Sequence, residues 1–338
     1  MHTGKTEEQL RVGFVGCGAH ARQSIYPCLR MAPIELCAVC DLVPEKAQEV
    51  GRWFGAQRTY TDHREMMERE QLDAVFVVAG PRVHPVVACD ALERGLHVWM
   101  EKPPAASSAD AMDVVRASEK AGKHVMVGFM KRFATGYLKA KESSESAEFG
   151  TPTFIECRYT SGRYPDEATH ILDFSIHALD LVRFFMGDVS RLYAEKFRLR
   201  DGSVAIAVTL KFANGAVGTL HLGSCEGWFN AGERVVIGGD GTAVVVDNVV
   251  NFMQLPRESP EKPHSSPLEH GSFWHPNWFY PADINTSLAH QGYVGEIRHF
   301  AESILAGTAP KPDISDGYEA LRLVEALQQH GGALVEIG

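Results

Sequence analysis

A short apolar run followed at once by a glycine-rich turn constrains the fold more than any other stretch of the chain. Residues 12–15 can form a buried strand, and Gly16, Gly18 and Ala21 then give the pattern G-x-G-x-x-A. Gly16 permits a tight turn, Gly18 lets a pyrophosphate approach the backbone, and Ala21 allows the next helix to pack closely. The helix N-terminus then offers free N–H groups to phosphates. The pattern predicts a dinucleotide site, although an ordinary strand–turn–helix can carry the same residues.

A second apolar run strengthens the dinucleotide interpretation. It covers residues 34–40 and ends at Asp41, about 20 residues beyond the turn, where such sites carry an acidic residue. A carboxylate there can accept hydrogen bonds from both ribose hydroxyls, and it repels a 2′-phosphate. Because no arginine follows in Leu42-Val43-Pro44, the sequence predicts NAD rather than NADP.

The first part of the chain alternates between strand-like and helix-like segments. After the two runs above, strands are predicted at residues 72–79, 98–100 and 124–129, and helices at 20–31, 44–53, 62–70, 84–94 and 109–121. Such alternation is typical of right-handed crossovers and a doubly wound parallel sheet.

From residue 153 onward the pattern changes to strands without intervening helices. They are predicted at residues 153–159, 189–197, 204–212, 217–222, 234–237 and 243–247, with Asn214-Gly215 as a hairpin turn. A helix over residues 169–186 interrupts them, a loop covers residues 256–281, and helices at 293–305 and 316–330 follow. We expect an α/β protein: a dinucleotide-binding domain over residues 1–133, and an α+β domain with an open, mainly antiparallel sheet over residues 134–338.

Composition excludes several classes of protein. The net charge of −10 argues against a broad nucleic-acid or anionic-membrane surface. No apolar run approaches the ~20 residues that span a bilayer, and the polar first residues lack a signal-peptide core. The 7 cysteines are scattered, and Cys37-x-x-Cys40 lies in a predicted strand whose residues three apart face opposite sides. We therefore expect a cytoplasmic protein in a reducing compartment.

The helix over residues 169–186 is apolar nearly all round and therefore buried. Asp173, His177 and Asp180 follow one another at i, i+4 and i+7, so they share one face. Ionisable groups on a buried helix are costly unless they are paired or face a cleft. His177 could act as a general base beside Asp173, or the stripe could be a structural Asp–His pair with Asp180 capping a neighbouring loop. The helix by itself leaves both interpretations open.

Lys102 is a second candidate for chemistry. It follows a strand of the parallel sheet, at the carboxyl edge where open α/β folds bind ligands. Glu101 precedes it, and Pro103 restricts its backbone. A solvated turn lysine is the alternative.

Together these motifs resemble the glucose–fructose oxidoreductase and inositol dehydrogenase (Gfo/Idh/MocA) family over essentially the whole chain. The resemblance rests on the turn at Gly16, the run Ala91-Leu-x-x-Gly-x-His-Val-x-x-Glu-Lys-Pro103, the Asp173-x-x-x-His177-x-x-Asp180 helix and Asp316-Gly-x-x-Ala-Leu321. It implies that Lys102, Asp173 and His177 form the catalytic group, with His177 as base. It implies cofactor contacts at Gly16, Gly18, Ala19, His20, Asp41, Gly80, His84, Glu101 and Lys102.

The resemblance also implies a substrate and an assembly. The segment Gly128-Phe-Met-Lys-Arg-Phe133 is similar to one that contributes to a substrate pocket. The implied substrate is a sugar or cyclic polyol, in contact with Lys102, Met130, Lys131, Arg132, Asp173 and His177. Open sheets in this family pack face to face, so we expect an apolar outer face on the second sheet and a homodimer or homotetramer.

Three functions remain open from the sequence. The first is an NAD-dependent dehydrogenase, and the second a redox-neutral epimerase, lyase or glycosidase with tightly held NAD. The third, a non-catalytic nucleotide-binding regulatory protein, has no need of the Lys102, Asp173 and His177 set. No metal site is predicted, because no standard zinc spacing fits His170, His264, His270, His275 and His290.

Overall fold

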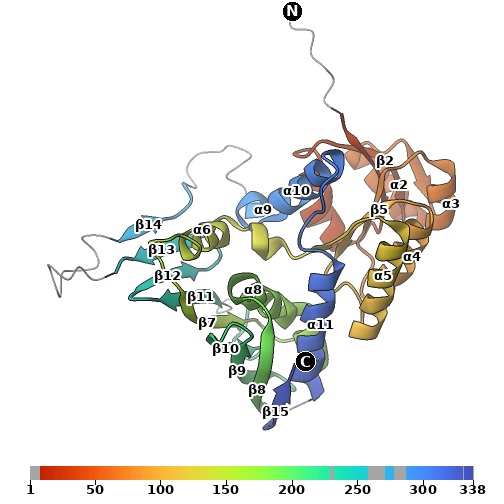
Figure 1. The fold of residues 1–338 in the computed structure, drawn as a ribbon. Helices are drawn as coiled ribbons and strands as arrows, with labels where there is room; N and C mark the ends of the chain where they lie inside the picture. The colour runs from red at the N-terminus through yellow and green to blue at the C-terminus, as the bar shows by residue number, and fades with distance from the viewer. Residues whose placement is uncertain (1–7, 229–231, 258–270, 278–286, 330, 338) are drawn as a thin grey trace, which may run out of the picture. The chain divides into compact units, whose positions relative to one another are not determined.

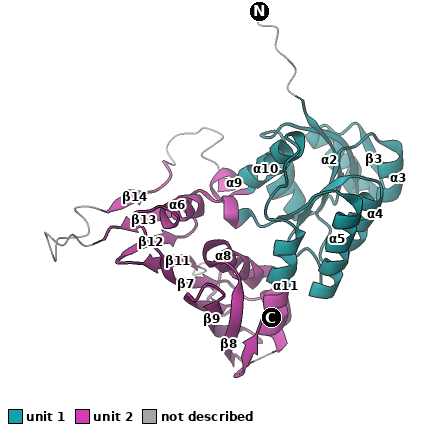
Figure 2. Cartoon of the chain, in the orientation of Figure 1, with its two compact units in different colours: residues 1–130, 293–321 teal, residues 131–292, 322–338 magenta. Residues whose placement is uncertain are grey.

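The computed structural model describes residues 8–228, 232–257, 271–277, 287–329 and 331–337 (Figure 1). The chain divides into two compact units, and each is built from two separate segments (Figure 2). The first unit comprises Met1–Met130 and Tyr293–Leu321, and the second comprises Lys131–Gly292 and Arg322–Gly338. The first segment ends close to the expected boundary at residue 133. The return of Tyr293–Leu321 to the first unit was not expected.

The first unit contains the predicted parallel sheet. It has six strands in the order β3-β2-β1-β4-β5-β6, and every neighbouring pair is parallel. This order is the one that binds dinucleotides where it reverses, next to β1. Strands buried on both faces need apolar residues throughout, and β4 and β6 are buried at every position. The strands are β1 (Leu10–Val15), β2 (Ile34–Cys40), β3 (Arg58–Tyr60), β4 (Ala74–Val77), β5 (His97–Glu101) and β6 (Val125–Gly128).

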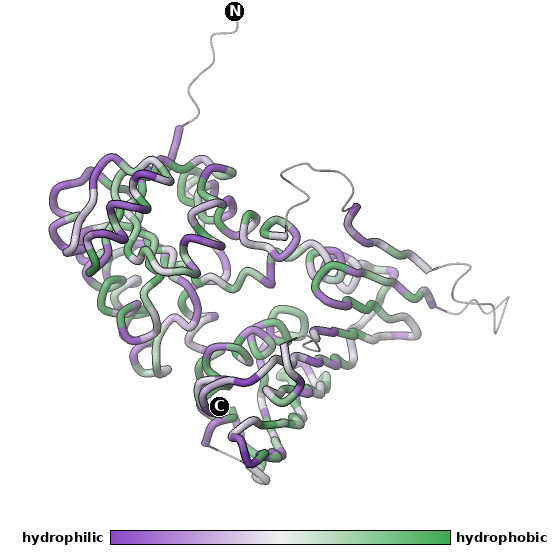
Figure 3. The backbone as a smooth tube through the Cα atoms, turned by 180° about the vertical axis from the view of Figure 1, so that it is seen from behind, coloured by the Kyte–Doolittle hydropathy of each residue, from purple (hydrophilic) through white to green (hydrophobic). Residues whose placement is uncertain are grey.

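Capping residues mark several of the helix ends in the first unit. The side chain of Asp62 accepts a hydrogen bond at the start of α3, and that of Ser107 does so at the start of α5. Gly55 and Gly122 end α2 and α5 in the left-handed conformation. Figure 3 shows how hydrophilic and hydrophobic residues alternate along the helices. The helices are α2 (Pro44–Phe54), α3 (His63–Arg69), α4 (His84–Glu93), α5 (Ser108–Ala121) and α10 (Tyr293–Leu305), while α11 (Ile314–Gln329) crosses the boundary between the units.

The helix after the glycine-rich turn is irregular, as Pro27 in its sequence predicts. It begins as a π-helix, η1 (Ala21–Ile25), and continues as a short α1 (Tyr26–Leu29), in whose first turn Pro27 lies. Proline has no N–H to donate, so the first turn of a helix accommodates it.

The second unit contains the predicted open, mainly antiparallel sheet. The nine strands that the structure describes have the order β14-β13-β12-β11-β7-β10-β9-β8-β15, and among them only β7 and β10 pair in parallel. The predicted hairpin turn joins β9 to β10. The strands are β7 (Pro152–Thr160), β8 (Val189–Arg198), β9 (Val204–Phe212), β10 (Val217–Gly223), β11 (Gly232–Gly239), β12 (Thr242–Asp247), β13 (Asn251–Leu255), β14 (Ser272–Trp274) and β15 (Leu334–Glu336).

Helices cover one face of this sheet. α6 (Thr135–Ser144) packs on β12 and β13, and α8 (Ile176–Met186) packs on β7. The opposite face is mixed rather than apolar as expected, because Val217, Thr219 and His221 are exposed along β10, and Ala207 and Thr209 along β9. The homodimer or homotetramer therefore stays a prediction.

The loop expected over residues 256–281 also differs from the structure. Among its described residues, Ser272–Trp274 form β14 at the edge of the sheet. Such a short edge strand carries too few residues for an alternating pattern to indicate it.

Two further observations concern membrane-spanning helices and disulfide bonds. None of the helices in the described ranges combines the length and the apolarity that crossing a bilayer requires. All seven cysteines lie in those ranges, and each of them is a free thiol.

Candidate functional site

The turn after β1 depends on Gly16 for steric reasons. Gly16 has a φ of +108°, and a Cβ placed on it would lie 2.0 Å from the carbonyl oxygen of Val78. Its N–H donates to the carbonyl oxygen of Cys40, 2.8 Å away, at the end of β2. The first glycine of the pattern is therefore required by the fold itself.

Gly18 lies in a different environment. No heavy atom lies within 4 Å of a Cβ placed on it, and no positive φ constrains it. Ala19 and His20 next to it are exposed, while Ala21 is fully buried. The space above Gly18 at the start of η1 is open, as a bound pyrophosphate would require.

Asp41 is held in place by the same turn. Its Oδ2 accepts a hydrogen bond of 2.8 Å from the N–H of Cys17, and its Oδ1 accepts one of 2.9 Å from the N–H of Val43. Two donors on opposite oxygens fix the plane of the carboxylate, and each oxygen keeps a lone pair for a further donor. The open space at Gly18 and this anchored carboxylate fit a dinucleotide with a free ribose 2′-hydroxyl.

Replacement of Asp41 by alanine is expected to narrow the preference for NAD over NADP by about tenfold, because the repulsion of a 2′-phosphate is lost together with the ribose hydrogen bonds. Titration of both cofactors against the purified protein measures this. Asp62→Ala is the matched control, since it removes a helix-capping carboxylate from the same unit. Equal binding of the two cofactors by the unmodified protein would contradict the assignment.

Glu101 and Lys102 lie at the carboxyl end of β5. Glu101 is buried, and its Oε1 accepts a hydrogen bond of 2.9 Å from Nε2 of His20. This bond joins β5 to the glycine-rich turn. Lys102 is half-buried.

His84 holds two backbone segments of this edge together. Its Nε2 accepts hydrogen bonds from the N–H groups of Ala79 and Gly80, at 3.1 and 3.0 Å, and its Nδ1 donates to the carbonyl oxygen of Pro103 at 2.8 Å. This pattern requires a neutral ring, and burial lowers the pKa of His84. Both ring nitrogens are thus occupied by backbone groups. His84 therefore positions the Gly80 loop beside Pro103, the residue after Lys102. The expected contact of His84 with the cofactor stays a prediction.

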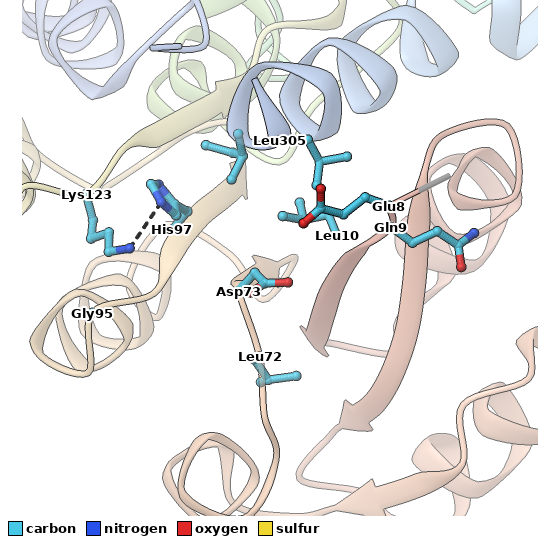
Figure 4. A pocket seen from close by; sticks show the side chains of 10 residues that line it. Glu8, Gln9, Leu10, Leu72, Asp73, Gly95, His97, Lys123 and Leu305 are labelled. Carbon is cyan, nitrogen blue, oxygen red and sulfur yellow. Dashed lines mark hydrogen bonds between the residues drawn. The ribbon is translucent and has the colours of Figure 1, made fainter. Parts of the chain in front are cut away.

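A separate polar pocket of about 270 Å³ lies at the opposite, amino edge of the same sheet (Figure 4). Asp73, His97 and Lys123 contribute to its lining. Burial, followed by the charges of Lys123 and His124, lowers the pKa of His97 to about 4. The expected cofactor residues follow the carboxyl ends of β1, β2, β4 and β5, so this pocket takes no part in that site.

In the second unit, the helix expected over residues 169–186 consists of three consecutive segments, α7 (Glu167–His170), the π-helix η3 (Ile171–Ser175) and α8. Asp173 lies in the π-turn and is half-buried, while His177 lies in α8 and is 6% exposed. A π-turn shifts its hydrogen bonds from i+4 to i+5, and such turns are frequent at functional sites. The α-helical spacing from which a shared face was predicted is therefore interrupted between these two residues.

Asp180 has a structural partner. Its carboxylate accepts two parallel hydrogen bonds from the guanidinium of Arg132, at 2.9 Å from Nε and 2.7 Å from a terminal nitrogen. Asp180 is 1% exposed, so this is a buried bidentate pair. For Asp180, the interpretation that it holds a neighbouring loop agrees with this contact.

Met130, Lys131 and Arg132 form a short 3-10 turn. Met130 and Lys131 are buried, and Nζ of Lys131 lies 2.6 Å from Oε2 of Glu233. The other oxygen of Glu233 accepts a hydrogen bond of 2.5 Å from the hydroxyl of Tyr137. Both cationic side chains of the predicted substrate segment are therefore engaged by carboxylates of the second unit.

Aromatic rings gather around the π-turn, and sequence reasoning did not single them out. The ring of Phe174 lies 4.5 Å from that of Tyr159 and 5.9 Å from that of Tyr164. Trp228 is 60% exposed and lies 5.9 Å from Tyr164. Burial, followed by the charge of Asp173, raises the pKa of Tyr164. The sequence signal for this cluster is weak, because its members are scattered over several elements.

Metal ligands were not expected, and the described residues contain no group of three or more potential ligands that could hold an ion. His170 is fully buried, and burial lowers its pKa to about 4. His275 and His290 are described as well, whereas His264 and His270 lie outside the described residues.

Two family models match this chain. An oxidoreductase family with an NAD-binding Rossmann fold matches residues 10–129, and the C-terminal alpha/beta domain of that oxidoreductase family matches residues 145–331.

Individual proteins agree with these models over nearly the full length. An uncharacterized oxidoreductase, YrbE, of Bacillus subtilis is 25% identical over 95% of this chain and 94% of its own. A myo-inositol 2-dehydrogenase of Thermotoga maritima is 26% identical over 93% of this chain and 94% of its own. The crystal structure of a dehydrogenase from Chromobacterium violaceum superposes with a TM-score of 0.86, at 21% identity and over 96% of both chains.

Proposed function

The chain belongs to the Gfo/Idh/MocA oxidoreductase family and is an NAD-binding oxidoreductase, and from this premise we propose that it oxidises a carbinol group of a sugar or cyclic polyol. The proposal rests on two facts taken together. The chain belongs to this family, and the helix that carries Asp173 and His177 is interrupted by a π-turn. A hydroxyl group needs a base to take its proton, and a histidine is the side chain best suited to that near neutral pH.

In this proposal the first unit holds the cofactor. The backbone at Gly18 lies against the pyrophosphate, and Asp41 accepts hydrogen bonds from the adenosine ribose. His20 and Glu101 bridge the turn and β5 at the same edge. When bound, NAD supplies the acceptor for the hydride that leaves the carbinol carbon.

The proton is handled by this chain's own side chains. His177 takes the hydroxyl proton as general base, and Asp173 orients either the substrate or the imidazole. Lys102 has the role that the family resemblance implies for it, which is to donate a hydrogen bond to an oxygen on which negative charge grows during the reaction. His84 supports Lys102 through the carbonyl oxygen of Pro103.

Two observations support a ring-shaped polyol as the substrate. The Thermotoga maritima relative is named as a myo-inositol 2-dehydrogenase. The aromatic rings of Phe174, Tyr164 and Trp228 next to Asp173 offer flat apolar surfaces, which suit the C–H face of a sugar or cyclitol ring, while carboxylate and imidazole groups suit its hydroxyls.

A substrate panel tests the proposal directly. The purified protein is incubated with NAD and, in turn, with myo-inositol, other cyclic polyols, aldoses and ketoses, and formation of NADH is followed. We expect steady reduction of NAD with at least one cyclic substrate. Conversion of a sugar without net NADH would favour a redox-neutral reaction instead, and NAD binding without any turnover across the panel would favour a regulatory protein.

A further inference from the structure

α10 brings a second acidic side chain into the interior beside Glu101. It packs against β1, η1 and α1 within the first unit. Glu296 on this helix is 0% exposed, and Glu101 is 3% exposed. Within the described residues, Oε2 of Glu101 and both carboxyl oxygens of Glu296 are buried without a hydrogen-bond partner. The ring of Tyr293, three positions before Glu296 on α10, lies 6.0 Å from the ring of His20, whose Nε2 is bonded to Glu101, so both carboxyl groups belong to one region of the first unit. Three buried acceptor atoms there require an explanation, because such atoms nearly always have partners.

A proton supplies the missing donor. Two ionised carboxylates in an apolar interior lose their hydration and repel each other, so a close pair keeps one proton between them. A protonated carboxyl group is a donor, whereas a carboxylate only accepts. Burial, followed by the charge of Glu101, raises the pKa of Glu296 well above its usual value.

The groups around Glu296 agree with a neutral side chain. Cys28 of α1 and Tyr293 of α10 face the same region, and burial is the first cause of the raised pKa of each. Both side chains are neutral at neutral pH, so neither can stabilise an ionised Glu296 with a positive charge. Among the described residues of this region, His20 contributes an imidazole, which donates to Oε1 of Glu101 at 2.9 Å.

We propose that Glu296 is a positioning residue of the dinucleotide site: its carboxyl group retains a proton and donates it in a hydrogen bond to Oε2 of Glu101. Glu101 is then held between Glu296 on one oxygen and His20 on the other, and the pair carries one negative charge instead of two. A doubly charged pair next to the exposed His20 of the glycine-rich turn would repel an anionic pyrophosphate. This inference rests on the proposed function only in that the turn binds NAD.

The proton on Glu296 is tested without any cofactor. Above the ordinary pKa of a glutamate, about 4.3, the unfolded chain releases this proton and the folded chain retains it. The contribution of this proton to the free energy of unfolding is therefore complete at lower pH and is lost as the pH rises towards the raised pKa. The unfolding equilibrium constant then increases by up to about tenfold per pH unit. Glutamine has no titratable proton, so the stability of Glu296→Gln does not fall in this way as the pH rises. Thermal and denaturant unfolding from pH 5 to 8 should show Glu296→Gln gaining stability over the unmodified protein as pH rises. A difference independent of pH would mean that Glu296 is ionised in the fold, and would overturn the proposal.

The positioning role is tested by NAD titration of three variants. Glu296→Gln keeps a donor for Oε2 of Glu101, so its affinity should stay within about threefold of the unmodified protein. Glu296→Ala removes the donor and should weaken NAD binding about tenfold. Ile297→Ala is the matched control, because it creates a cavity at a fully buried neighbour on α10 without touching the pair. It should lose stability and keep its NAD affinity.

The results of these titrations distinguish a failure of this inference from a failure of the proposed function. Loss of affinity in Ile297→Ala equal to that in Glu296→Ala, or normal affinity in Glu296→Ala, would overturn the positioning role while NAD binding stands. Failure of the unmodified protein to bind NAD would overturn the proposed function together with the positioning role. The pH dependence of Glu296→Gln would still decide where the proton resides.

Discussion

Replacement of His177 by alanine should lower turnover by roughly 10²–10⁴-fold, the usual contribution of a general base. The NAD affinity should stay near that of the unmodified protein, since the proposed cofactor contacts lie in the glycine-rich turn and at Asp41. Steady-state rates with the best substrate of the panel, together with NAD titration and thermal unfolding, measure all three properties. Lys102→Ala should likewise lower kcat more than it changes KM, because the hydrogen bond proposed for Lys102 would strengthen as charge develops on the reacting oxygen.

His170→Ala is the matched control for His177→Ala. His170 is a fully buried histidine in the first segment of the same helix, so its loss reports what a missing buried imidazole does to stability alone. We expect it to destabilise the protein and to leave turnover in the remaining folded fraction unchanged. If His177→Ala behaves in the same way, with stability lost and turnover kept, His177 is structural and not catalytic.

Replacement of Gly18 by valine should weaken NAD binding by about 100-fold or more. Its side chain would occupy the open space above the turn and keep the pyrophosphate from several backbone N–H groups, each worth ~1.5–3 kcal/mol to a charged acceptor. The fold should tolerate the change, because no heavy atom lies within 4 Å of the new Cβ. Cofactor titration and circular dichroism on the same preparation test both statements.

Gly16→Ala is the contrast to Gly18→Val, because it should affect the fold itself. Its Cβ would lie 2.0 Å from the carbonyl oxygen of Val78, at a φ of +108° that side chains rarely adopt, so we expect a large loss of stability. Normal cofactor affinity in Gly18→Val would mean that the glycine-rich turn has only a structural role.

Local patterns were enough to predict the first sheet and most of the second. Apolar runs between helices predicted a parallel sheet, and the Asn214-Gly215 turn predicted the β9–β10 hairpin, both of which the structure confirms. The π-turns η1 and η3 could not be predicted, because a π-turn differs from an α-turn by one hydrogen-bond register and has no residue signature of its own. The strand β13 (Asn251–Leu255) was missed as well as the edge strands β14 and β15, and each of the two edge strands has only three residues.

The candidate site residues also divide into those that a sequence pattern indicates and those that only the folded chain brings together. The glycine-rich pattern and an acidic residue about 20 positions after it are signals that the sequence alone displays, so Gly16, Gly18 and Asp41 could be singled out as candidates from the sequence. Pairings between distant residues cannot. Arg132 and Asp180 are 48 positions apart, Lys131 and Glu233 are 102 positions apart, and no local spacing relates either pair. For Glu296 the spacing on α10 indicates burial, but only the folded chain reveals the acid beside it.

The discontinuous first unit has a consequence for synthesis of the protein. Phe300 on α10 packs edge-on against Phe76 of β4, with ring centroids 5.5 Å apart, yet the whole of Lys131–Gly292 is translated between them. At ~5–20 residues per second, a ribosome needs roughly 10–30 s for a stretch of that length. During this interval the strands of the parallel sheet lack α10, and apolar side chains that α10 contacts in the folded chain, Phe76 among them, lack that partner. A fragment that stops near residue 133 would stay in that incomplete condition permanently.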